Sequence, residues 1–489
     1  MNRREFLKLG TASAATATLA AKSGTDGPRG PERLRLGIMS DIHVQTHRCI
    51  EERILPSFTY FRDREVDGVM VAGDLTDWGQ KAQLKMLADA WYSVFPRDRH
   101  PKSGKKVERL FIYGNHDIEG WRYDYRKWEN LPKDYTDATG IGSDRHRAEF
   151  WEEIFGEKWE PIVYKDVKGY KFVLANYGGW RFFHFTDIIG LPEMLAAHDD
   201  ELRDGKPFFY SQHLLLRNTS TAPWCRWVDS GKTTELLSRY PNCVAVTGHT
   251  HVGLADDHDL WRGAFTGVGA STTWNLHKLG GRENSSLVTD GVPRGEQMPD
   301  MEIRGRHGLV LHVHDDALVF ERYDFLSRGK IGPDWVVPWP PRPATDEERR
   351  AAVPVPQFPK DAAVSFRGIH GRDRAGDPVD QVVVGFPNVG PKSARAFDYE
   401  VAAEVLVNDA QYVWRAKRVF SPAFQMAQAA DVHPLTCVFA AAELPPANAG
   451  CLPAQGRQFR FVVTPLNSYG ARGKSICSKW TALEQIAFA

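Results

Sequence analysis

Five clusters of Asp, His and Asn side chains each follow an apolar run, and these are residue types that bind transition metals. In chain order they are Asp41-Ile-His43, Gly73-Asp74-Leu-Thr-Asp77, Gly114-Asn115-His116-Asp117, His213 after Tyr210-Ser-Gln, and Gly248-His249-Thr-His251. In an extended segment, side chains at i and i+2 leave on one face, so each D-x-H or H-x-H pair can reach one cavity. Any single histidine is more simply explained by a core hydrogen bond. The five clusters together favour one shared metal site.

The apolar runs before these clusters are expected to be buried strands. They span residues 34–39, 67–73, 109–114, 207–212 and 243–248. Between the second and third runs, apolar residues recur at helical spacing from Leu84 to Phe95, and residues 234–240 make another short helix. This alternation predicts an α/β domain with a largely parallel core, over residues 33–330. Open α/β sheets place their sites at the carboxyl ends of the strands, where the clusters lie.

The overall composition is that of a globular protein of several domains. Its 489 residues include 62 Lys plus Arg and 62 Asp plus Glu, so no net charge favours nucleic acid or an anionic membrane. The six cysteines are scattered, without the close pairs of a structural zinc site, and are expected to be mostly buried. A disulfide from Cys437 to Cys451 or Cys477 stays open if the protein reaches an oxidising compartment.

The first 24 residues resemble a twin-arginine export signal. Arg3 and Arg4 precede a weakly hydrophobic run that ends in small residues near Ala20 and Ala21. The run is too short and too polar for a permanent membrane span. We therefore expect export by the twin-arginine machinery and a periplasmic or secreted mature protein. The alternative is a disordered basic amino terminus.

The carboxyl-terminal third differs from the rest of the chain in its composition and sequence pattern. Residues 331–360 are rich in proline and predict a semi-rigid linker. Residues 361–489 contain strand-like segments separated by turn residues, with little helical periodicity, and predict a β-sandwich. The segment RQFRFVVTPLNSYGARGKS resembles the penultimate strand and turn of fibronectin type III domains.

The order D-x-H, G-D-x-x-D, G-N-H-D, H, G-H-x-H resembles the calcineurin-like metallophosphoesterase superfamily over roughly residues 33–325. The resemblance implies a four-layered α/β/β/α sandwich that carries two metal ions. It assigns to the first metal the side chains of Asp41, His43, Asp74 and His251. It assigns to the second those of Asp74, Asn115, His213 and His249, with Asp74 bridging.

This resemblance also implies a mechanism. Two metals about 3.5 to 4 Å apart share an anionic ligand, and a hydroxide between them attacks phosphorus in line. Imidazole, carboxylate and amide ligands suit Fe, Mn or Zn, in the divalent or trivalent state. The family uses His116 as general acid or as a positive group near the leaving oxygen, and we expect Asp117 to orient it. Asp77 is expected to support the loop or the ligands without binding metal.

Three details bear on the substrate. Asp77 in GDLTD, where purple acid phosphatases carry Tyr, disfavours that branch, whereas GDLTDWG and SDIH resemble bacterial phosphodiesterases. Gln212-His213-Leu214 departs from the His-His-Pro frequent in those enzymes, which leaves substrate contacts there open. The aromatic-rich segment between Ile118 and Trp180 predicts either a lid that stacks on the substrate or an insertion packed on the domain.

We therefore expect a phosphoric ester hydrolase acting on a small molecule, with a phosphodiesterase favoured over a phosphomonoesterase. One alternative is a metal-binding scaffold that acts through its surface. Another is an adhesion protein whose main actor is the carboxyl-terminal sandwich, an analogy that rests on fold alone.

Overall fold

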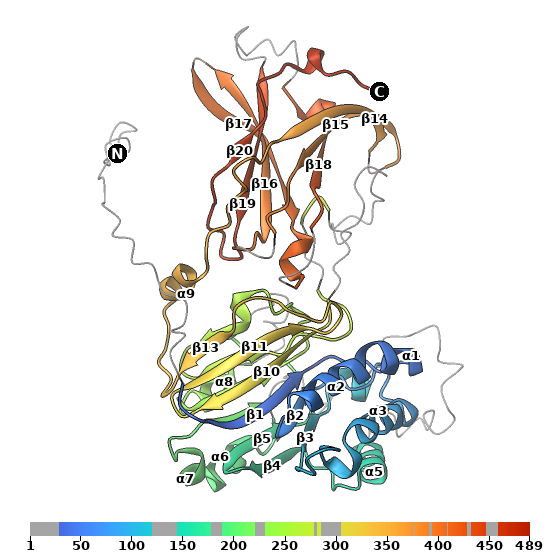
Figure 1. Ribbon diagram of the computed structural model, residues 1–489, viewed down its shortest axis with the longest axis vertical. Helices are drawn as coiled ribbons and strands as arrows, with labels where there is room; N and C mark the ends of the chain where they lie inside the picture. The colour runs from blue at the N-terminus through green and yellow to red at the C-terminus, as the bar shows by residue number, and fades with distance from the viewer. Residues whose placement is uncertain are drawn as a thin grey trace.

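In the computed structural model, two facing β-sheets flanked by helices form the amino-terminal part of the chain, and a separate β-rich part follows (Figure 1). The structure describes residues 29–119, 144–177, 188–220, 230–277, 281–284, 305–373, 375–390, 394–407, 409–427, 432–445 and 458–489. The expected export signal lies outside these ranges. None of the described helices has the length and apolar character needed to cross a membrane.

The first sheet has the order β12-β11-β10-β1-β2-β3, and β13 also pairs with β11. Its strands are β1 (Glu32–Met39), β2 (Gly68–Ala72), β3 (Glu108–Ile112), β10 (His307–His314), β11 (Ala317–Asp324), β12 (Gly329–Lys330) and β13 (Trp335–Pro338). Strands β1, β2 and β3 run parallel, with Leu36 opposite Gly68 and Gly68 opposite Glu108. The first three predicted strands are thus confirmed, and their carboxyl ends meet at one edge.

The second sheet has the order β4-β5-β6-β7-β9-β8. Its strands are β4 (Ile162–Val167), β5 (Tyr170–Ala175), β6 (Phe208–Ser211), β7 (Cys243–Thr247), β8 (Leu260–Arg262) and β9 (Thr266–Gly269). Strands β5, β6, β7 and β9 are parallel, and the outer strands β4 and β8 are antiparallel to their neighbours. The last two predicted strands, β6 and β7, therefore belong to a different sheet from the first three.

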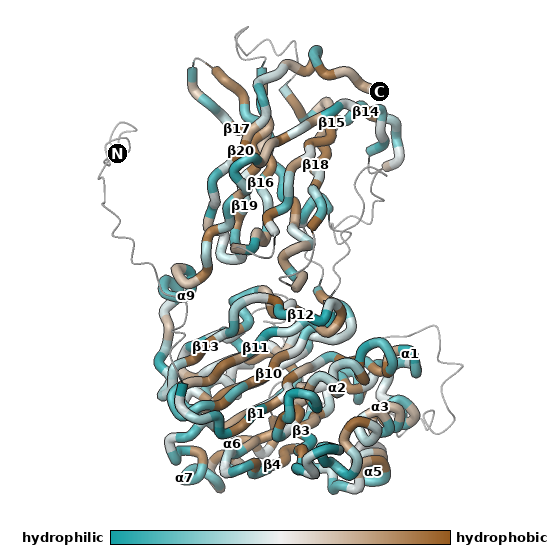
Figure 2. The backbone as a smooth tube through the Cα atoms, viewed as in Figure 1, coloured by the Kyte–Doolittle hydropathy of each residue, from teal (hydrophilic) through white to brown (hydrophobic). Residues whose placement is uncertain are grey.

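Three apolar cores hold these layers together. One lies between the sheets, where Leu36, Leu110 and Phe320 of the first sheet meet Phe172 and Val244 of the second. Figure 2 shows the hydrophobic residues along strands β1, β10 and β11 that contribute to it. The outer face of the first sheet packs against η1 (Ile50–Ile54), α2 (Leu55–Asp63), α3 (Lys81–Val94) and α5 (Asp144–Phe155). The short helices α1 (His47–Cys49) and η2 (Pro96–Asp98) adjoin them in the chain and bury no residues. The outer face of the second packs against α6 (Leu191–Ala197), α7 (Asp199–Leu202) and α8 (Lys232–Leu237). The predicted four-layered α/β/β/α sandwich is confirmed.

The proline-rich segment 331–360 differs from the expected linker. Strand β13 extends the first sheet, with Leu318 opposite Val337, and a short helix α9 (Asp346–Ala352) follows. Thr345 begins α9 with a capping box, in which its hydroxyl accepts from the Glu348 amide and the Glu348 carboxylate accepts from the Thr345 amide. The first domain therefore continues to Pro338, because the edge of β11 pairs with the chain that leaves it.

The carboxyl-terminal part is a sandwich of two antiparallel sheets, β14-β15-β18 and β17-β16-β19-β20. Its strands are β14 (Ser365–Arg372), β15 (Pro378–Phe386), β16 (Asp398–Val407), β17 (Ala410–Phe420), β18 (Leu435–Ala440), β19 (Phe459–Leu466) and β20 (Ile476–Cys477), with the short helices η8 (Pro422–Gln425), η9 (Ala441–Glu443) and η11 (Leu483–Gln485). One core lies between the sheets and includes Val384, Tyr399 and Phe461. The all-β expectation for this part of the chain is confirmed.

The two described cysteines of the sandwich are free. Cys437 is buried on β18 and Cys477 is exposed on β20, so the suggested disulfide between them is not formed. Their strands lie in different sheets. Cys451, the other suggested partner, lies outside the described residues.

Only part of the aromatic-rich segment is described. Trp151 lies on α5, is 7% exposed, and packs edge-on against Tyr113 with ring centroids 5.2 Å apart. Trp159 packs against the same core. These two residues pack on the domain, whereas Trp121, Tyr123, Tyr125 and Trp128 lie outside the described ranges.

Candidate metal centre

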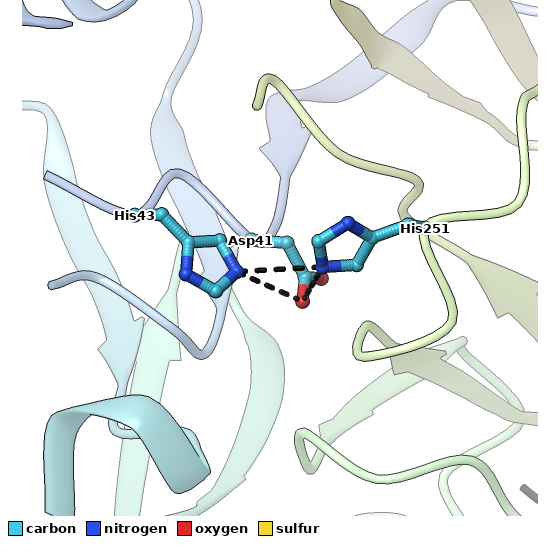
Figure 3. A group of neighbouring side chains, drawn as sticks. All are labelled: Asp41, His43 and His251. Carbon is cyan, nitrogen blue, oxygen red and sulfur yellow. Dashed lines mark hydrogen bonds and ion pairs between the residues drawn. The ribbon is translucent and has the colours of Figure 1, made fainter. Parts of the chain in front are cut away.

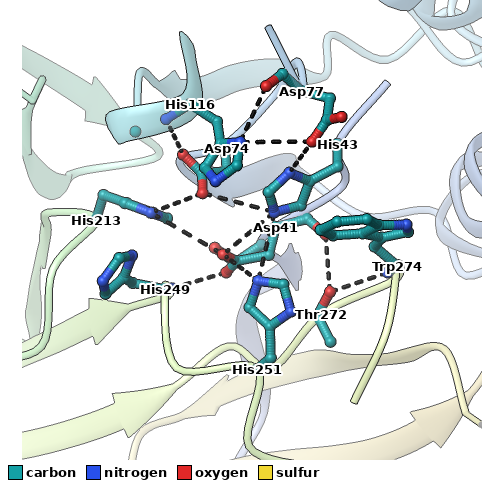
Figure 4. A network of polar contacts seen from close by, with 12 residues as sticks. Asp41, His43, Asp74, Asp77, His116, His213, His249, His251, Thr272 and Trp274 are labelled. Carbon is teal, nitrogen blue, oxygen red and sulfur yellow. Dashed lines mark hydrogen bonds and ion pairs between the residues drawn. The ribbon is translucent and has the colours of Figure 1, made fainter. Parts of the chain in front are cut away.

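Loops from both sheets bring the predicted Asp and His ligand side chains to one place between the sheets' carboxyl edges (Figure 4). Asp41 and His43 follow β1, and Asp74 follows β2. Asn115 and His116 begin α4 (Asn115–Glu119), directly after β3. His213 follows β6, while His249 and His251 follow β7.

A first ligand group consists of Asp41, His43 and His251 (Figure 3). The Nε2 atoms of the two histidines are 3.3 Å apart, and both face Asp41 Oδ1, at 3.8 Å from His43 and 3.0 Å from His251. Three ligand atoms that converge within 4.8 Å of one another can bind one cation.

A second group consists of Asp74, His213 and His249. Asp74 Oδ2 lies 3.1 Å from His213 Nε2 and 3.6 Å from His43 Nε2, so this carboxylate stands between the two groups. Its other oxygen, Oδ1, accepts a 2.8 Å hydrogen bond from the His116 amide, which places the buried Asn115 beside it. Asp74 therefore occupies the position that a bridging ligand requires.

Two buried atoms of the site indicate that a cation belongs there. Asp41 Oδ1 and His213 Nε2 have no well-formed hydrogen bond among the described residues, although oppositely charged groups lie near both. A buried polar atom without a hydrogen bond is costly. Carboxylate oxygens and imidazole nitrogens are ligands of Zn, Fe and Mn, so the residues fit the expected metals without selecting one of them.

The backbone at the ligands is strained. Residues in the left-handed region include Asp41 (φ 49°), His43 (φ 42°), Asp74 (φ 51°), His249 (φ 67°) and His251 (φ 51°). Non-glycine residues rarely adopt this conformation, and it costs on the order of 1 kcal/mol or more each. Such strain persists where the surrounding structure imposes it, and it typically clusters at functional sites.

Glycine 114 is required by close packing. A Cβ atom there would lie 2.2 Å from Asp74 Oδ1 and 2.4 Å from the Asp74 backbone nitrogen. The residue is outside the left-handed region, so its lack of a side chain matters more here than its conformational freedom. The chain after β3 and the Asp74 carboxylate can therefore approach each other only with glycine at this position.

In the metal-free protein, protons on the imidazoles supply the positive charge that metal ions would otherwise supply. Burial alone would raise the pKa of Asp41, but the nearby His251 and His213 hold it well below its ordinary value. Burial alone would lower the pKa of His213, but Asp74 and Asp41 raise it to about 9. His249, by contrast, has its pKa lowered to about 3, first by burial and then by His213. Metal binding at His213 would therefore release a proton at neutral pH.

The surroundings of His116 correct one expectation. Asp117 does not orient it, because the Asp117 carboxylate accepts hydrogen bonds from the amides of Gly114, Leu75 and Thr76 and from the Thr76 hydroxyl. The carboxylate beside the His116 Nδ1 atom is that of Asp77, with Oδ1 3.4 Å from it. Through these hydrogen bonds, Asp117 instead connects the start of α4 to the loop after β2.

Asp77 contacts the imidazoles of both His43 and His116. Its Oδ1 lies 3.0 Å from His43 Nδ1, and its backbone oxygen accepts from His116 Nδ1 at 2.9 Å. Burial alone would lower the pKa of His116, but Asp74 and Asp77 raise it to about 9. Asp77 thus supports a ligand and the candidate acid together, which extends the supporting role expected for it.

The loop after β9 contributes residues that the sequence motifs did not indicate. The Thr272 hydroxyl donates to the Asp41 carbonyl at 2.8 Å, and His251 Nδ1 lies 2.8 Å from the Asn275 carbonyl. The Trp274 indole lies over His43, with ring centroids 4.3 Å apart and a 42° tilt, and is 36% exposed. The segment STTWN carries no spacing signal. Only the folded loop brings it to the site.

Comparison with known proteins gives one family match and several similar solved structures. Residues 34–253 match the family model described as calcineurin-like phosphoesterase. No curated protein gives a significant match. Among solved structures, the chain is similar to a dimetal phosphatase from Danio rerio, with 10% identity, TM-score 0.38, and coverage of 63% of this chain and 100% of that one. It is also similar to the anchor in the inner membrane complex of Plasmodium, with 9% identity, TM-score 0.36, and coverage of 66% and 96%.

Replacing Asp77 by Asn tests its support of His43. The amide keeps the size but loses the negative charge that fixes and polarises the imidazole, so we expect metal affinity to fall by about 10- to 100-fold. Titration of the metal-free protein with Mn(II), followed by electron paramagnetic resonance, measures this. Asp315→Asn makes the same charge change at an exposed ion pair with Arg33 and serves as control. Equal affinities in the two variants would contradict the role given to Asp77.

Proposed function

We propose, since residues 34–253 form a calcineurin-like phosphoesterase domain, that this protein is a two-metal phosphoric ester hydrolase. The observation that carries the proposal is the position of Asp74, within reach of ligand atoms from both groups. A carboxylate placed between two sets of imidazoles is suited to hold two cations a few ångströms apart. A site for a single structural metal would not need the second group of ligand side chains.

The residues divide between the metals as the family resemblance implies. Asp41, His43 and His251 would hold the first metal, and Asn115, His213 and His249 would hold the second, with Asp74 shared. When bound, the two cations supply an acidified water and neutralise charge on the phosphoryl oxygens. The chain's own part is to fix the ligands in advance, through the strained loops and the buried carboxylates described above.

His116 is placed to hold the proton for the leaving oxygen. Its Nδ1 lies against the Asp77 carbonyl, which can only accept, so Nδ1 carries a hydrogen and exchange with the substrate would use Nε2. The neighbouring carboxylates keep the metal-free imidazole protonated at neutral pH. Bound cations would offset the charge of Asp74 and bring the pKa down again, toward the range in which an imidazole can give up its proton.

A phosphodiester substrate is favoured over a monoester. The support comes from the motifs GDLTDWG and SDIH and from the exposed Trp274 indole, which offers an apolar face beside His43 to a second organic group. The departure at Gln212 does not create a substrate contact, because its side chain accepts from Tyr210 and donates to the Leu214 carbonyl inside the domain. A phosphomonoesterase is the alternative for the same metal centre.

Hydrolysis of bis(p-nitrophenyl) phosphate and p-nitrophenyl phosphate tests the proposal. The metal-free protein is assayed alone and with Mn(II), Fe(II) or Zn(II). We expect activity only with metal, and a higher kcat/KM for the diester. A higher kcat/KM for the monoester would select the alternative. Metal binding without hydrolysis of either ester would favour the non-enzymatic scaffold.

Replacing His116 by Ala separates proton transfer from metal binding. We expect kcat to fall by about 100-fold or more because the leaving oxygen loses its acid, while two metals remain bound. The substrate is bis(p-nitrophenyl) phosphate, and metal content is measured by atomic emission. His370→Ala, at an exposed position on β14, is the control and should keep full activity. Loss of one metal from His116→Ala would show that this residue is a ligand instead.

Replacing Trp274 by Ala tests the apolar face. An aromatic contact is worth about 0.5 to 1.5 kcal/mol, so we expect KM for bis(p-nitrophenyl) phosphate to rise by about 2- to 10-fold with metal content unchanged. Trp414→Ala removes an indole that is 41% exposed on β17 of the sandwich, and it should leave KM unchanged. An unchanged KM in Trp274→Ala would exclude this residue from substrate binding.

A further inference from the structure

The sandwich touches the loop that carries His251. A Cβ atom on Gly253 would lie 1.9 Å from Gln425 Oε1, so the side chain of η8 fills the space beside this loop. The Leu254 amide donates to His307 Nδ1 at 3.1 Å, and His307 Nε2 lies 3.2 Å from the Gln425 carbonyl. Because Nδ1 accepts, Nε2 carries the hydrogen and donates it to that carbonyl. His307 thus bridges the ligand loop and the sandwich.

A second segment also holds His251, from its other side. The His277 amide donates to the His251 carbonyl at 2.8 Å, and the Asn275 carbonyl lies 2.8 Å from His251 Nδ1. That contact leaves Nε2 as the nitrogen that faces Asp41. The same segment carries Thr272 and Trp274, which touch Asp41 and His43. Residues 271–277 therefore contact each member of the first ligand group.

The continuation of this segment is docked on the sandwich. Asn284 is 7% exposed, donates to the Phe420 carbonyl at 2.9 Å and accepts from the Phe420 amide at 3.0 Å. Arg282 forms a two-pronged ion pair with Asp398, at 3.1 and 2.7 Å. The Glu283 amide donates to the Arg418 carbonyl at 2.8 Å. The chain between His277 and this docked stretch is short, so the position of one constrains the other.

We propose that the carboxyl-terminal sandwich is a positioning element of the metal centre, which holds His251 in place through Asn284 on one side and through His307 and Gln425 on the other. The proposal rests on the metal centre of the proposed function. The second ligand group depends less on this support. His213 is held by the Ala72 carbonyl of β2 at 2.7 Å and by Asp74 in the loop after β2. His249 shares the loop of His251, but its amide is held separately, by Asp41 Oδ2 at 2.8 Å.

The expected consequence is a selective loss of affinity at the first metal. In Asn284→Ala the docked stretch loses both hydrogen bonds to Phe420, and His251 is no longer held at its distance from Asp41 and His43. Loss of support behind a ligand typically weakens metal binding by about 10- to 100-fold. We expect a change of this size for Mn(II) at the first site and less than about threefold at the second, where only His249 lies on the loop of His251.

The measurement is a titration of the metal-free full-length protein with Mn(II), followed by electron paramagnetic resonance. His251→Ala and His213→Ala serve as references for the spectra with one site impaired. In Asn284→Ala the coupled two-metal spectrum should appear only at higher Mn(II) concentration than in the wild type. An unchanged titration would overturn the proposal.

Ser478→Ala is the matched control for a general loss of stability. Ser478 is 8% exposed and accepts from the Phe461 amide at 3.0 Å, inside the sandwich and away from the first domain. Thermal unfolding of both variants is measured beside the Mn(II) titrations. Selective weakening in Asn284→Ala with wild-type affinity in Ser478→Ala supports the proposal. Equal weakening in both variants overturns it.

A second pair of variants tests the contact at Gly253 directly. Gly253→Ala places a methyl group against the Gln425 side chain and should displace the loop, with weaker Mn(II) binding at the first site. Gln425→Ala added to Gly253→Ala removes the obstructing atoms and should restore the affinity. Gln425 Oε1 has no hydrogen bond among the described residues, so its removal has a small cost of its own. Failure of the double variant to recover would mean that the sandwich does not act on this loop.

These readouts separate the proposal from the proposed function. If the wild-type protein binds two Mn(II) ions but hydrolyses no ester, the hydrolase assignment fails and the positioning role stands. If it hydrolyses esters while Asn284→Ala binds Mn(II) as the wild type does, only the positioning role fails.

Discussion

The structure depends on two carboxylates, Asp41 and Asp74, that are buried side by side without solvent. Asp41 is 0% and Asp74 1% exposed. An unpaired buried charge is among the most costly features that a protein can contain, so positive charge must reach both groups. In the metal-free protein the protonated imidazoles of His213 and His116 supply it. The arrangement of the imidazoles around these carboxylates follows from that requirement.

Meeting this requirement needs loops that the backbone would not adopt by preference. Ligands sit in the left-handed region at the ends of β1, β2 and β7, and Gly114 lets β3 approach Asp74 without a side chain between them. The apolar core between the sheets, with Ile38, Met70 and Val246 fully buried just before these loops, provides the stability that such strain consumes. Each strained ligand loop therefore directly follows a buried strand of the apolar core.

The sequence predicted the strands and indicated which Asp and His side chains would meet, for a physical reason. Each strand is a short, fully buried apolar run, and each ligand cluster follows one directly, so both are local signals. What it could not predict are contacts between distant segments of the chain. Asp117 adjoins His116 in sequence but turns to the loop after β2, whereas Asp77 meets both His43 and His116. Trp274 comes to the site on a loop with no periodic or spaced pattern. Likewise, the sequence did not indicate strand β13, because its segment is rich in prolines. An edge strand tolerates prolines at these positions.

The division of the ligands between the two sheets has a consequence for the folded protein as a whole. Each ligand group takes side chains from both sheets: Asp41 and His43 face His251, and Asp74 faces His213 and His249. A bound cation would therefore act as a cross-link between layers that are otherwise joined by apolar contact and by hydrogen bonds such as those from Thr272 to the Asp41 carbonyl and from His213 to the Ala72 carbonyl, and it would oppose any sliding of one sheet over the other. Since metal binds the native state and only weakly the unfolded chain, the free metal concentration would set the unfolding temperature, with a contribution of about 4 kcal/mol at a thousand times the dissociation constant. Resistance to heat would then report directly on how much metal the protein has acquired.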